Sequence, residues 1–492
     1  MATERFTTEK KQAYENAKGI GWVTAVVFVV GDLVGGGLLG LPVSMVQATF
    51  VPGFILLIVY GSITTFTGYL LAEMWIMMQA RWPKYRKFCR KPYVAMANQA
   101  YGPSLKNLLI VLLILTQFGF ACVLLLLGAK NAAILLNFFF SVKISYCYLI
   151  FIVGLIVWPA TMLRSPMDFW QIAIFSGISS SIAAVLIVVG TIHDASVCSL
   201  QATHPNFEWQ NFFMAYGTFA FAYGGHNVLP SVQHDMRRPA DFKKSVFVTF
   251  SLGFIFYISV AVSGYEVYGN SLGEAVIPSI QLSWVRETVN LMIAIHVLTT
   301  IIIVLSPMFQ LFEDFLKVSH KFGWGRFLLR SVSYWLCVFI CLTVPNFGPL
   351  MDLIGASTMT ITSAVLPNVC YLYLNASGRK REERIRNGEI RADSPDDERA
   401  NWRDIVHYTK KPILVFCLFC IVFGTAGGVV ASVASAMKLA SSEVDAPCYV
   451  QYFRTGLPFN DLNSGMINCC GSYRNVTVSG ISPHGYCNET PK

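Results

Sequence analysis

The stretch VVFVVGDLVGGGLLGLPVSM, residues 26–45, decides the fold of this chain. It is apolar enough to cross a membrane, yet three consecutive glycines at 35–37 interrupt it near its middle. Each glycine destabilises a helix by about 1 kcal/mol, so three in a row predict a break. The stretch FMAYGTFAFAYGGHNVLPSVQ, residues 213–233, has two glycines at its own middle. Close helix packing explains one such motif equally well, but two matching motifs favour a pair of discontinuous helices.

The composition places both stretches in a membrane protein. Of 492 residues, 54% are hydrophobic and only 13% are charged, whereas soluble proteins carry about 25% charged residues. Apolar runs of about 20 residues, enough to span a bilayer as a helix, recur along the chain. They are apolar all round, unlike the alternating strands of a membrane barrel. The sequence therefore predicts an all-α polytopic membrane protein.

We predict eleven transmembrane helices within an eleven-span domain at residues 20–437, preceded by a polar cytoplasmic segment at 1–19. A charged cytoplasmic loop at 376–411 is expected to be a solvated linker, and residues 438–492 form a tail. The spans are expected at residues 20–45, 51–79, 105–138, 146–163, 168–191, 208–232, 245–268, 286–316, 326–344, 347–375 and 412–437.

The orientation follows from the positive charges. With a cytoplasmic N-terminus, 30 of the 37 lysines and arginines fall on the cytoplasmic side, as the positive-inside rule requires. The net charge of +9 is thereby explained without a nucleic-acid partner.

The tail carries features of an oxidising space outside the cytoplasm. Asn475 and Asn488 begin glycosylation sequons there. The five cysteines expected outside the membrane have a pairing that the sequence leaves open; they are Cys198, Cys448, Cys469, Cys470 and Cys487. We expect the plasma membrane rather than a lysosomal or vesicular membrane.

The two glycine breaks begin two groups of five spans, at residues 20–191 and 208–375. Because five is odd, the second group crosses the membrane in the opposite sense to the first. Such inverted repeats, with discontinuous helices near the midplane, build many secondary transporters. The predicted fold is therefore a 5+5 inverted repeat plus one extra helix at 412–437.

The sequence resembles the amino acid/auxin permease family over residues 20–435. The match rests on VGGGLLGLP at 34–42 and FAFAYGGHNVLPSVQHDMRRPADFKKS at 219–245, with LSPMFQLFED at 305–314 and LIGASTMTITSAVLP at 353–367. This resemblance implies a leucine-transporter-like fold, amino acid substrates, and H⁺ or Na⁺ as the coupling ion.

A zwitterionic amino acid suits such breaks because exposed N–H groups can receive its carboxylate and exposed carbonyls its ammonium group. We therefore expect a substrate site at the two breaks. Its expected residues are Val34, Gly35, Gly36, Gly37, Phe221, Ala222, Tyr223 and Gly224.

Four polar side chains are candidates for ion coupling. Asp32, beside the first break, can carry a proton or pair with the substrate ammonium, or else form a structural pair with Lys130 or a histidine. His226 follows the second break and can titrate or bond a freed carbonyl. The resemblance implies a Na⁺ site between spans one and eight, where Thr299 and Thr300 lie, although such hydroxyls commonly bond their own helix.

We expect that the protein is not an enzyme and has no metal site or cofactor, since the sequence has no ligand cluster of suitable spacing and no nucleotide-binding loop. The predicted function is a secondary active amino acid transporter working by alternating access. The alternative is a transceptor that binds amino acids and signals through the loop at 376–411. A channel is disfavoured by the inverted repeat, and the oligomeric state is left open.

Overall fold

The computed structural model describes residues 15–17, 19–87, 89–142, 144–162, 170–200, 202–319, 323–440 and 446–450. These residues are mostly helical and contain no β-strand; their one strand-like pairing is an isolated bridge between Ile20 and Met236. The predicted all-α class is thus confirmed for the described part of the chain.

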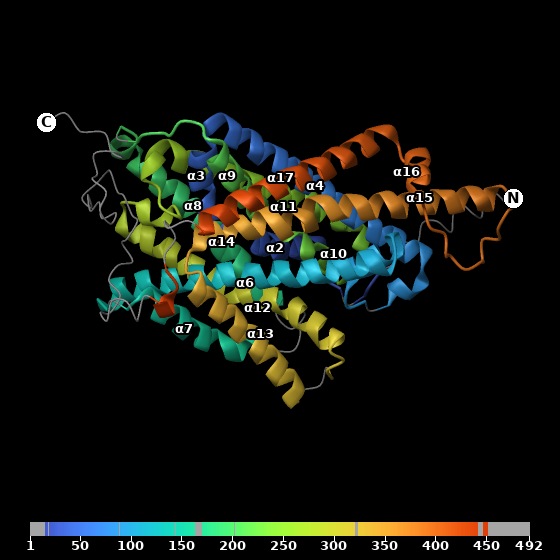
Figure 1. Ribbon diagram of the computed structural model, residues 1–492, viewed down its shortest axis with the longest axis horizontal. Helices are drawn as coiled ribbons and strands as arrows, with labels where there is room; N and C mark the ends of the chain where they lie inside the picture. Colours follow the sequence, from blue (N-terminus) through green and yellow to red (C-terminus); the bar gives the residue numbers. More distant parts are fainter. Residues whose placement is uncertain are drawn as a thin grey trace.

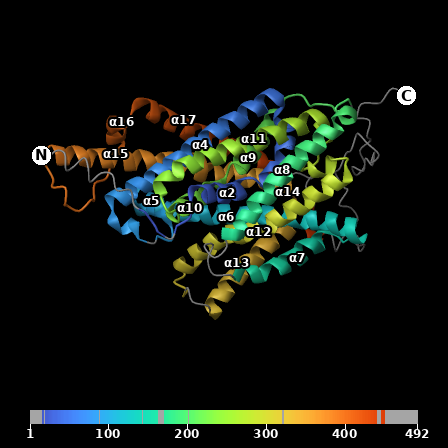
Figure 2. The same ribbon diagram turned by 180° about the vertical axis from the view of Figure 1, so that it is seen from behind.

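Eight spans predicted from the sequence coincide with helices long and apolar enough to cross a membrane. Figures 1 and 2 show them running roughly parallel to the longest axis of the molecule, with α7 and α13 along one side. The main helices of these spans are α4 (Phe50–Arg81), α6 (Pro103–Phe140), α8 (Trp170–Cys198), α11 (Phe242–Tyr268), α12 (Ser283–Phe315), α13 (Trp324–Thr343), α15 (Leu366–Arg386) and α17 (Lys411–Ala440).

The first predicted span is broken at its glycines, as expected. Helix α2 (Trp22–Leu33) ends before them and α3 (Gly36–Ala48) begins within them, at an angle of 54°. Together the pair is apolar enough to cross a membrane. The pair lies in the interior, where α2 packs on α8 and α3 packs on α9 (Trp209–Ala222).

Two predicted spans consist of shorter pieces. The fourth is α7 (Tyr146–Val157), which continues as a 3₁₀ turn at Trp158–Met162. The sixth is α9 followed by a 3₁₀ turn at Gly225–Asn227 and the short helix α10 (Leu229–His234). These pieces are too short to count as spans by length alone, so the total of eleven remains a prediction.

The outer surface supports a lipid environment. On α17, Val415, Val422 and Val429 are 66%, 63% and 65% exposed. They recur every seven residues, so they lie on one side of the helix. Large apolar side chains exposed in this number are expected where lipid, rather than water, surrounds the protein.

The charged segment after span ten departs from the expected linker. Span ten consists of α14 (Phe347–Ile354), two π-helical turns at Gly355–Met359 and Ile361–Val365, and α15, which continues to Arg386. The first residues of the supposed loop at 376–411 are therefore helical. The remaining short elements are η1 (Pro83–Arg86), α5 (Pro92–Ala100), η5 (Pro239–Asp241), η6 (Gly269–Ser271), η7 (Ile277–Ser279) and α16 (Trp402–Tyr408).

One disulfide joins residues that the sequence did not pair. Cys448 is bonded to Cys147, 301 residues earlier in the chain. Cys147 was not among the cysteines expected outside the membrane; it is the second residue of α7, at the very start of the predicted fourth span. Cys198 is also disulfide-bonded. The other predicted tail positions lie outside the described residues; they are Cys469, Cys470, Cys487, Asn475 and Asn488.

Candidate functional site

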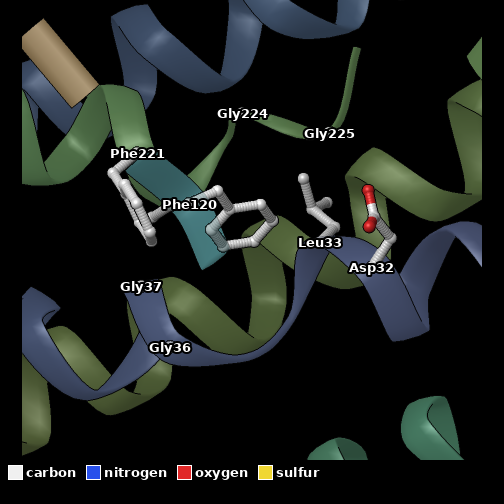
Figure 3. A pocket seen from close by; sticks show the side chains of 9 residues that line it. Asp32, Leu33, Gly36, Gly37, Phe120, Phe221, Gly224 and Gly225 are labelled. Atoms are coloured by element: carbon white, nitrogen blue, oxygen red, sulfur yellow. The ribbon is translucent and has the colours of Figure 1, made fainter. Parts of the chain in front are cut away.

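A small cavity lies between the two helix breaks (Figure 3). The space in it that can hold the centre of a water molecule is about 10 Å³, roughly the room of one water molecule. The cavity is therefore nearly closed in this structure. The residues that line it are Asp32, Leu33, Gly36, Gly37, Phe120, Phe221, Ala222, Gly224 and Gly225.

The structure brings together about half of the residues predicted from the sequence. Those that line the cavity are Asp32, Gly36, Gly37, Phe221, Ala222 and Gly224, and those that do not are Val34, Gly35, Tyr223, His226, Thr299 and Thr300. Phe120 contributes a ring from α6, and nothing in the sequence around it marked it as a site residue. The two breaks therefore border one cavity, and half of the predicted residues line it.

The two breaks meet at a glycine. A Cβ atom built on Gly37 would lie 2.6 Å from the Cα atom of Ala222, a distance that real Cβ atoms do not adopt. Only a residue without a side chain therefore lets α3 approach α9 this closely. By contrast, a Cβ atom on Gly36 would meet ordinary contacts, 3.5 Å from a methyl group of Leu127.

Helix ends of opposite polarity surround the cavity. Helix α3 begins at Gly36 with no side-chain cap, so the positive end of its dipole and its first N–H groups lie at the cavity. Helices α2 and α9 end at Leu33 and Ala222, where their carbonyl groups carry partial negative charge. An amino acid offers one charge of each sign to such a site.

Asp32 is the charged residue at the cavity wall (Figure 3). Its side chain is buried, and its Oδ1 atom has no hydrogen-bond partner among the described residues. The structural alternative, a pair with Lys130, is not formed, since Lys130 Nζ lies 2.8 Å from Glu274 Oε2. A carboxyl group in this position is available to a proton or to a ligand.

Tyr257, on α11, connects the two breaks and was missed by the sequence analysis. Its hydroxyl oxygen lies 2.6 Å from the carbonyl oxygen of Leu33 and 2.6 Å from that of Ala222. These carbonyls end α2 and α9 and would otherwise lack helical partners. A single tyrosine in an apolar span carries no sequence signal for this role, because both partners are backbone atoms of distant segments.

A buried group of side chains adjoins the first break; we call it the His296 cluster. Nδ1 of His296 lies 2.7 Å from Ser180 Oγ and 2.9 Å from Ser176 Oγ. Thr300 Oγ1 lies 2.8 Å from Ser176 Oγ. The imidazole fills the space beside Gly35, where a Cβ atom would lie 1.9 Å from its Nε2 atom. Thr300 thus lies near the break, where Ser176 connects it to His296.

The other predicted coupling residues have structural partners. Thr299 donates its hydroxyl to carbonyl groups of its own helix, at Ile295 and His296, which is the alternative that the sequence had left open. His226 Nε2 lies 2.9 Å from Thr67 Oγ1 and 3.0 Å from the carbonyl oxygen of Thr64, both on α4. His226 therefore ties the second break to α4 and does not line the cavity.

At a distance from the cavity, three cysteine thiols lie close enough together to hold a metal ion, although the sequence predicted no metal site. Cys122 on α6 lies beside Cys337 and Cys341 on α13, with all three sulfur atoms within 4.8 Å. The thiols of Cys122 and Cys337 lie 3.2 Å apart, and Cys341 donates to the carbonyl oxygen of Cys122. Buried cysteines commonly pack in this way as small apolar residues.

Comparisons with known proteins show the family to which the chain belongs. A family model described as transmembrane amino acid transporter protein matches residues 18–389. Among relatives from Arabidopsis thaliana, lysine histidine transporter-like 1 is 28% identical, over 73% of this chain and 81% of its own length. Lysine histidine transporter-like 6 is 24% identical, over 77% and 88% of the two chains. Amino acid transporter AVT1B is 24% identical, over 71% of this chain and 64% of its own length.

The matched residues contain both helix breaks and every residue that lines the cavity. The family consists of transporters, which confirms both the resemblance noted in the sequence and the prediction that the chain is not an enzyme. The protein is a multi-pass membrane protein that belongs to the transmembrane amino acid transporter family.

Proposed function

We propose that this protein is a secondary active transporter that moves amino acids across a membrane by alternating access around the cavity. The observation that carries the proposal is the meeting of two broken helices at the buried carboxyl group of Asp32, whose Oδ1 atom has no hydrogen-bond partner among the described residues. Discontinuous helices that face each other at mid-membrane are the usual substrate sites of secondary transporters.

The cavity suits the two charges of an amino acid. The substrate carboxylate is proposed to bind the N–H groups at the start of α3, near Gly36 and Gly37. The substrate ammonium is proposed to bind carbonyl oxygens at the end of α9, near Phe221 and Ala222. Phe120 and Phe221 form the apolar wall. Two of the relatives are described as transporters of lysine and histidine type, so these amino acids are the first to test.

For the topology we propose eleven spans, counting α7 and the α9–α10 pair, in a 5+5 inverted repeat with one extra helix. The disulfide between Cys147 and Cys448 supports an oxidising space at the end of the molecule where α7 begins. We therefore propose that the N-terminus and the segment 376–411 are cytoplasmic, that the tail is outside, and that the protein lies in the plasma membrane.

For the coupling ion we propose H⁺ rather than Na⁺. The resemblance implies a Na⁺ site between spans one and eight, but the His296 cluster fills the space beside Gly35. Asp32 is instead proposed to carry the proton. Its buried Oδ1 atom has no hydrogen-bond partner among the described residues, and a carboxyl group at this depth is more stable when it is neutral. Proton binding at Asp32 and substrate binding at the helix ends then occur in one cavity.

The proposed function is tested by uptake of each labelled proteinogenic amino acid, beginning with lysine and histidine, into proteoliposomes that contain the purified protein. We expect the labelled amino acid to accumulate inside the proteoliposomes when the external solution is the more acidic one. We expect no accumulation when a Na⁺ gradient is imposed at constant pH. Liposomes without protein serve as the control. No transport of any proteinogenic amino acid would refute the function, and accumulation driven by Na⁺ alone would refute the proposed coupling.

Replacing Tyr257 by Phe tests the connection between the breaks. The ring is kept, but two carbonyl groups lose their shared partner, and an unpaired buried polar group costs about 1–3 kcal/mol. We expect uptake to fall about tenfold, since roughly 1.4 kcal/mol corresponds to a factor of ten. The matched control is Tyr334→Phe, which removes a hydrogen bond to Gly154 between α13 and α7. Equal losses in both variants would contradict a specific role for Tyr257.

The alternative function, a sensor that signals through residues 376–411, receives less support. This segment is not a free interaction arm, because α15 packs against α16, Lys380 pairs with Asp404 within the segment, and Asp396 pairs with Arg81 on α4. We therefore propose that its role is to control transport.

A further inference from the structure

The loop between α15 and α16, residues 388–401, is bound to the helices beneath it; we call it the strap. Its main anchor is Asp396, whose two carboxylate oxygens accept hydrogen bonds from Nε and Nη2 of Arg81 at 2.8 and 3.0 Å. The side chains of this pair are only 13% and 7% exposed. A two-pronged, partly buried pair of this kind is among the stronger ionic contacts in proteins. It ties the strap to the end of α4.

A second anchor ties the strap to α15. Arg381 donates from Nη2 to the carbonyl oxygen of Ser394 at 2.6 Å and from Nη1 to that of Pro395 at 3.1 Å. Nη1 of Arg384, on the same helix, lies 2.6 Å from Oε2 of Glu398. Figure 1 shows α15 extending beyond the other helices at this end, with α16 beside it. The strap therefore holds the ends of α4 and α15 together.

Ser394 stands between these anchors in a sequence suited to a protein kinase. It is followed by Pro395 and then by Asp396, Asp397 and Glu398, and kinases of the proline-directed class require a serine or threonine directly before proline. The serine is half-buried, its neighbours Asp393 and Pro395 are exposed, and none of the three lies in a helix or strand. An enzyme can therefore reach this segment from solvent.

We propose that Ser394 is a phosphorylation site and that Arg381 receives its phosphate, which tightens the strap onto α4 and α15. The phosphoryl donor is a nucleoside triphosphate. The serine oxygen forms a bond to the γ-phosphorus atom, the bond to the nucleoside diphosphate breaks, and the hydroxyl proton passes through the kinase to solvent. The inference rests on the cytoplasmic orientation proposed above.

Tightening, rather than release, follows from the charges around the serine. A phosphate brings a charge of about −1.5 to −2 at neutral pH. The Nη atoms of Arg381 already lie at the carbonyl groups of Ser394 and Pro395, while its Nε lies 3.7 Å from Asp396 Oδ2. The Nη atoms can therefore exchange neutral acceptors for a charged one that binds roughly twice as strongly. Of the nearby acids, Asp396 is neutralised by Arg81, while Asp393 and Asp397 are exposed and screened by salt.

A tighter strap would slow transport. Alternating access requires helices around the site to move relative to one another, and the strap joins α4, which packs on α10 below the second break, to α15. Phosphorylated protein is therefore expected to take up amino acid more slowly than the unmodified protein, with the same substrate preference.

The test uses full-length protein treated with a proline-directed kinase and ATP, or with a phosphatase. Phosphate on Ser394 is measured by mass spectrometry, strap opening by the rate of trypsin cleavage after Arg391, and transport by uptake in proteoliposomes. We expect phosphorylation to slow cleavage about tenfold, the effect of one added charge-assisted contact. Ser394→Ala should abolish both effects. Arg381→Ala should keep the phosphate but lose the slowing, whereas Arg379→Ala, an exposed change on the same helix, should retain it.

No phosphate on Ser394 under these conditions would overturn the proposal, and so would phosphate that leaves cleavage unchanged or accelerates it. If the unmodified protein transports no amino acid, the proposed function fails, while cleavage still tests the strap. If uptake is normal but phosphorylation does not change it, only the proposed control of transport fails.

Discussion

Replacing Asp32 by Asn is expected to abolish proton-driven accumulation of amino acid while leaving exchange of amino acid across the membrane intact. The amide resembles the neutral, protonated carboxyl group in shape but can neither release nor accept the proton. In wild-type protein, one pH unit across the membrane is worth about 1.4 kcal/mol, or a tenfold concentration ratio for one coupled proton. In the variant, labelled substrate should only equilibrate.

Two assays check this prediction in the same proteoliposomes: uptake driven by a pH gradient, and exchange of external labelled substrate for internal unlabelled substrate. The matched control is Asp352→Asn, which alters a second buried carboxyl group that does have a partner, the hydroxyl of Thr218. The control should still accumulate substrate. Accumulation of wild-type extent by the Asp32 variant would remove this residue from the coupling mechanism.

Replacing Gly37 by Ala is expected to have the second-largest effect. The added methyl group would lie 2.6 Å from Cα of Ala222, so α3 and α9 must move apart at the cavity. Overpacking of this kind costs about 1–3 kcal/mol, and here the displacement falls on the N–H groups proposed to bind the substrate. We expect uptake to fall at least about tenfold, measured per molecule of folded protein.

The neighbouring glycine supplies the control. A methyl group on Gly36 would lie 3.5 Å from Leu127, which is an ordinary contact, so Gly36→Ala should retain uptake within about threefold of wild type. Both changes remove one glycine from the same three-glycine run and lower its flexibility alike. If both variants lose uptake equally, flexibility rather than the close approach of α3 and α9 explains the glycines.

The sequence predicted features that depend on local composition. Glycines within an apolar run weaken a helix wherever they occur, so the break between α2 and α3 was predictable from residues 35–37 alone. The long apolar helices were predictable for the same reason. The expectation that the two breaks lie together needed an argument from the count of spans. The structure places Gly37 against Ala222, while the count of spans stays a prediction.

Features that depend on distant pairings were not predictable. Tyr257 reaches carbonyl groups at Leu33 and Ala222, and the pattern around it is that of any apolar span. His296 owes its position beside Gly35 to the packing of α12 on α8, not to its neighbours in sequence. The charges of the segment 376–411 predicted a solvated loop. The sequence does not reveal that Arg81, at the end of α4, binds Asp396 of this segment.

The most direct test of the substrate site is hydrogen–deuterium exchange of the wild-type protein with and without a transported amino acid. Amide groups that receive the substrate carboxylate should exchange more slowly. We predict slower exchange in peptides that cover residues 33–38 and 221–225, and unchanged exchange in α13 and α17, which do not line the cavity. Protection elsewhere in the protein, with none at these two breaks, would contradict the proposed site.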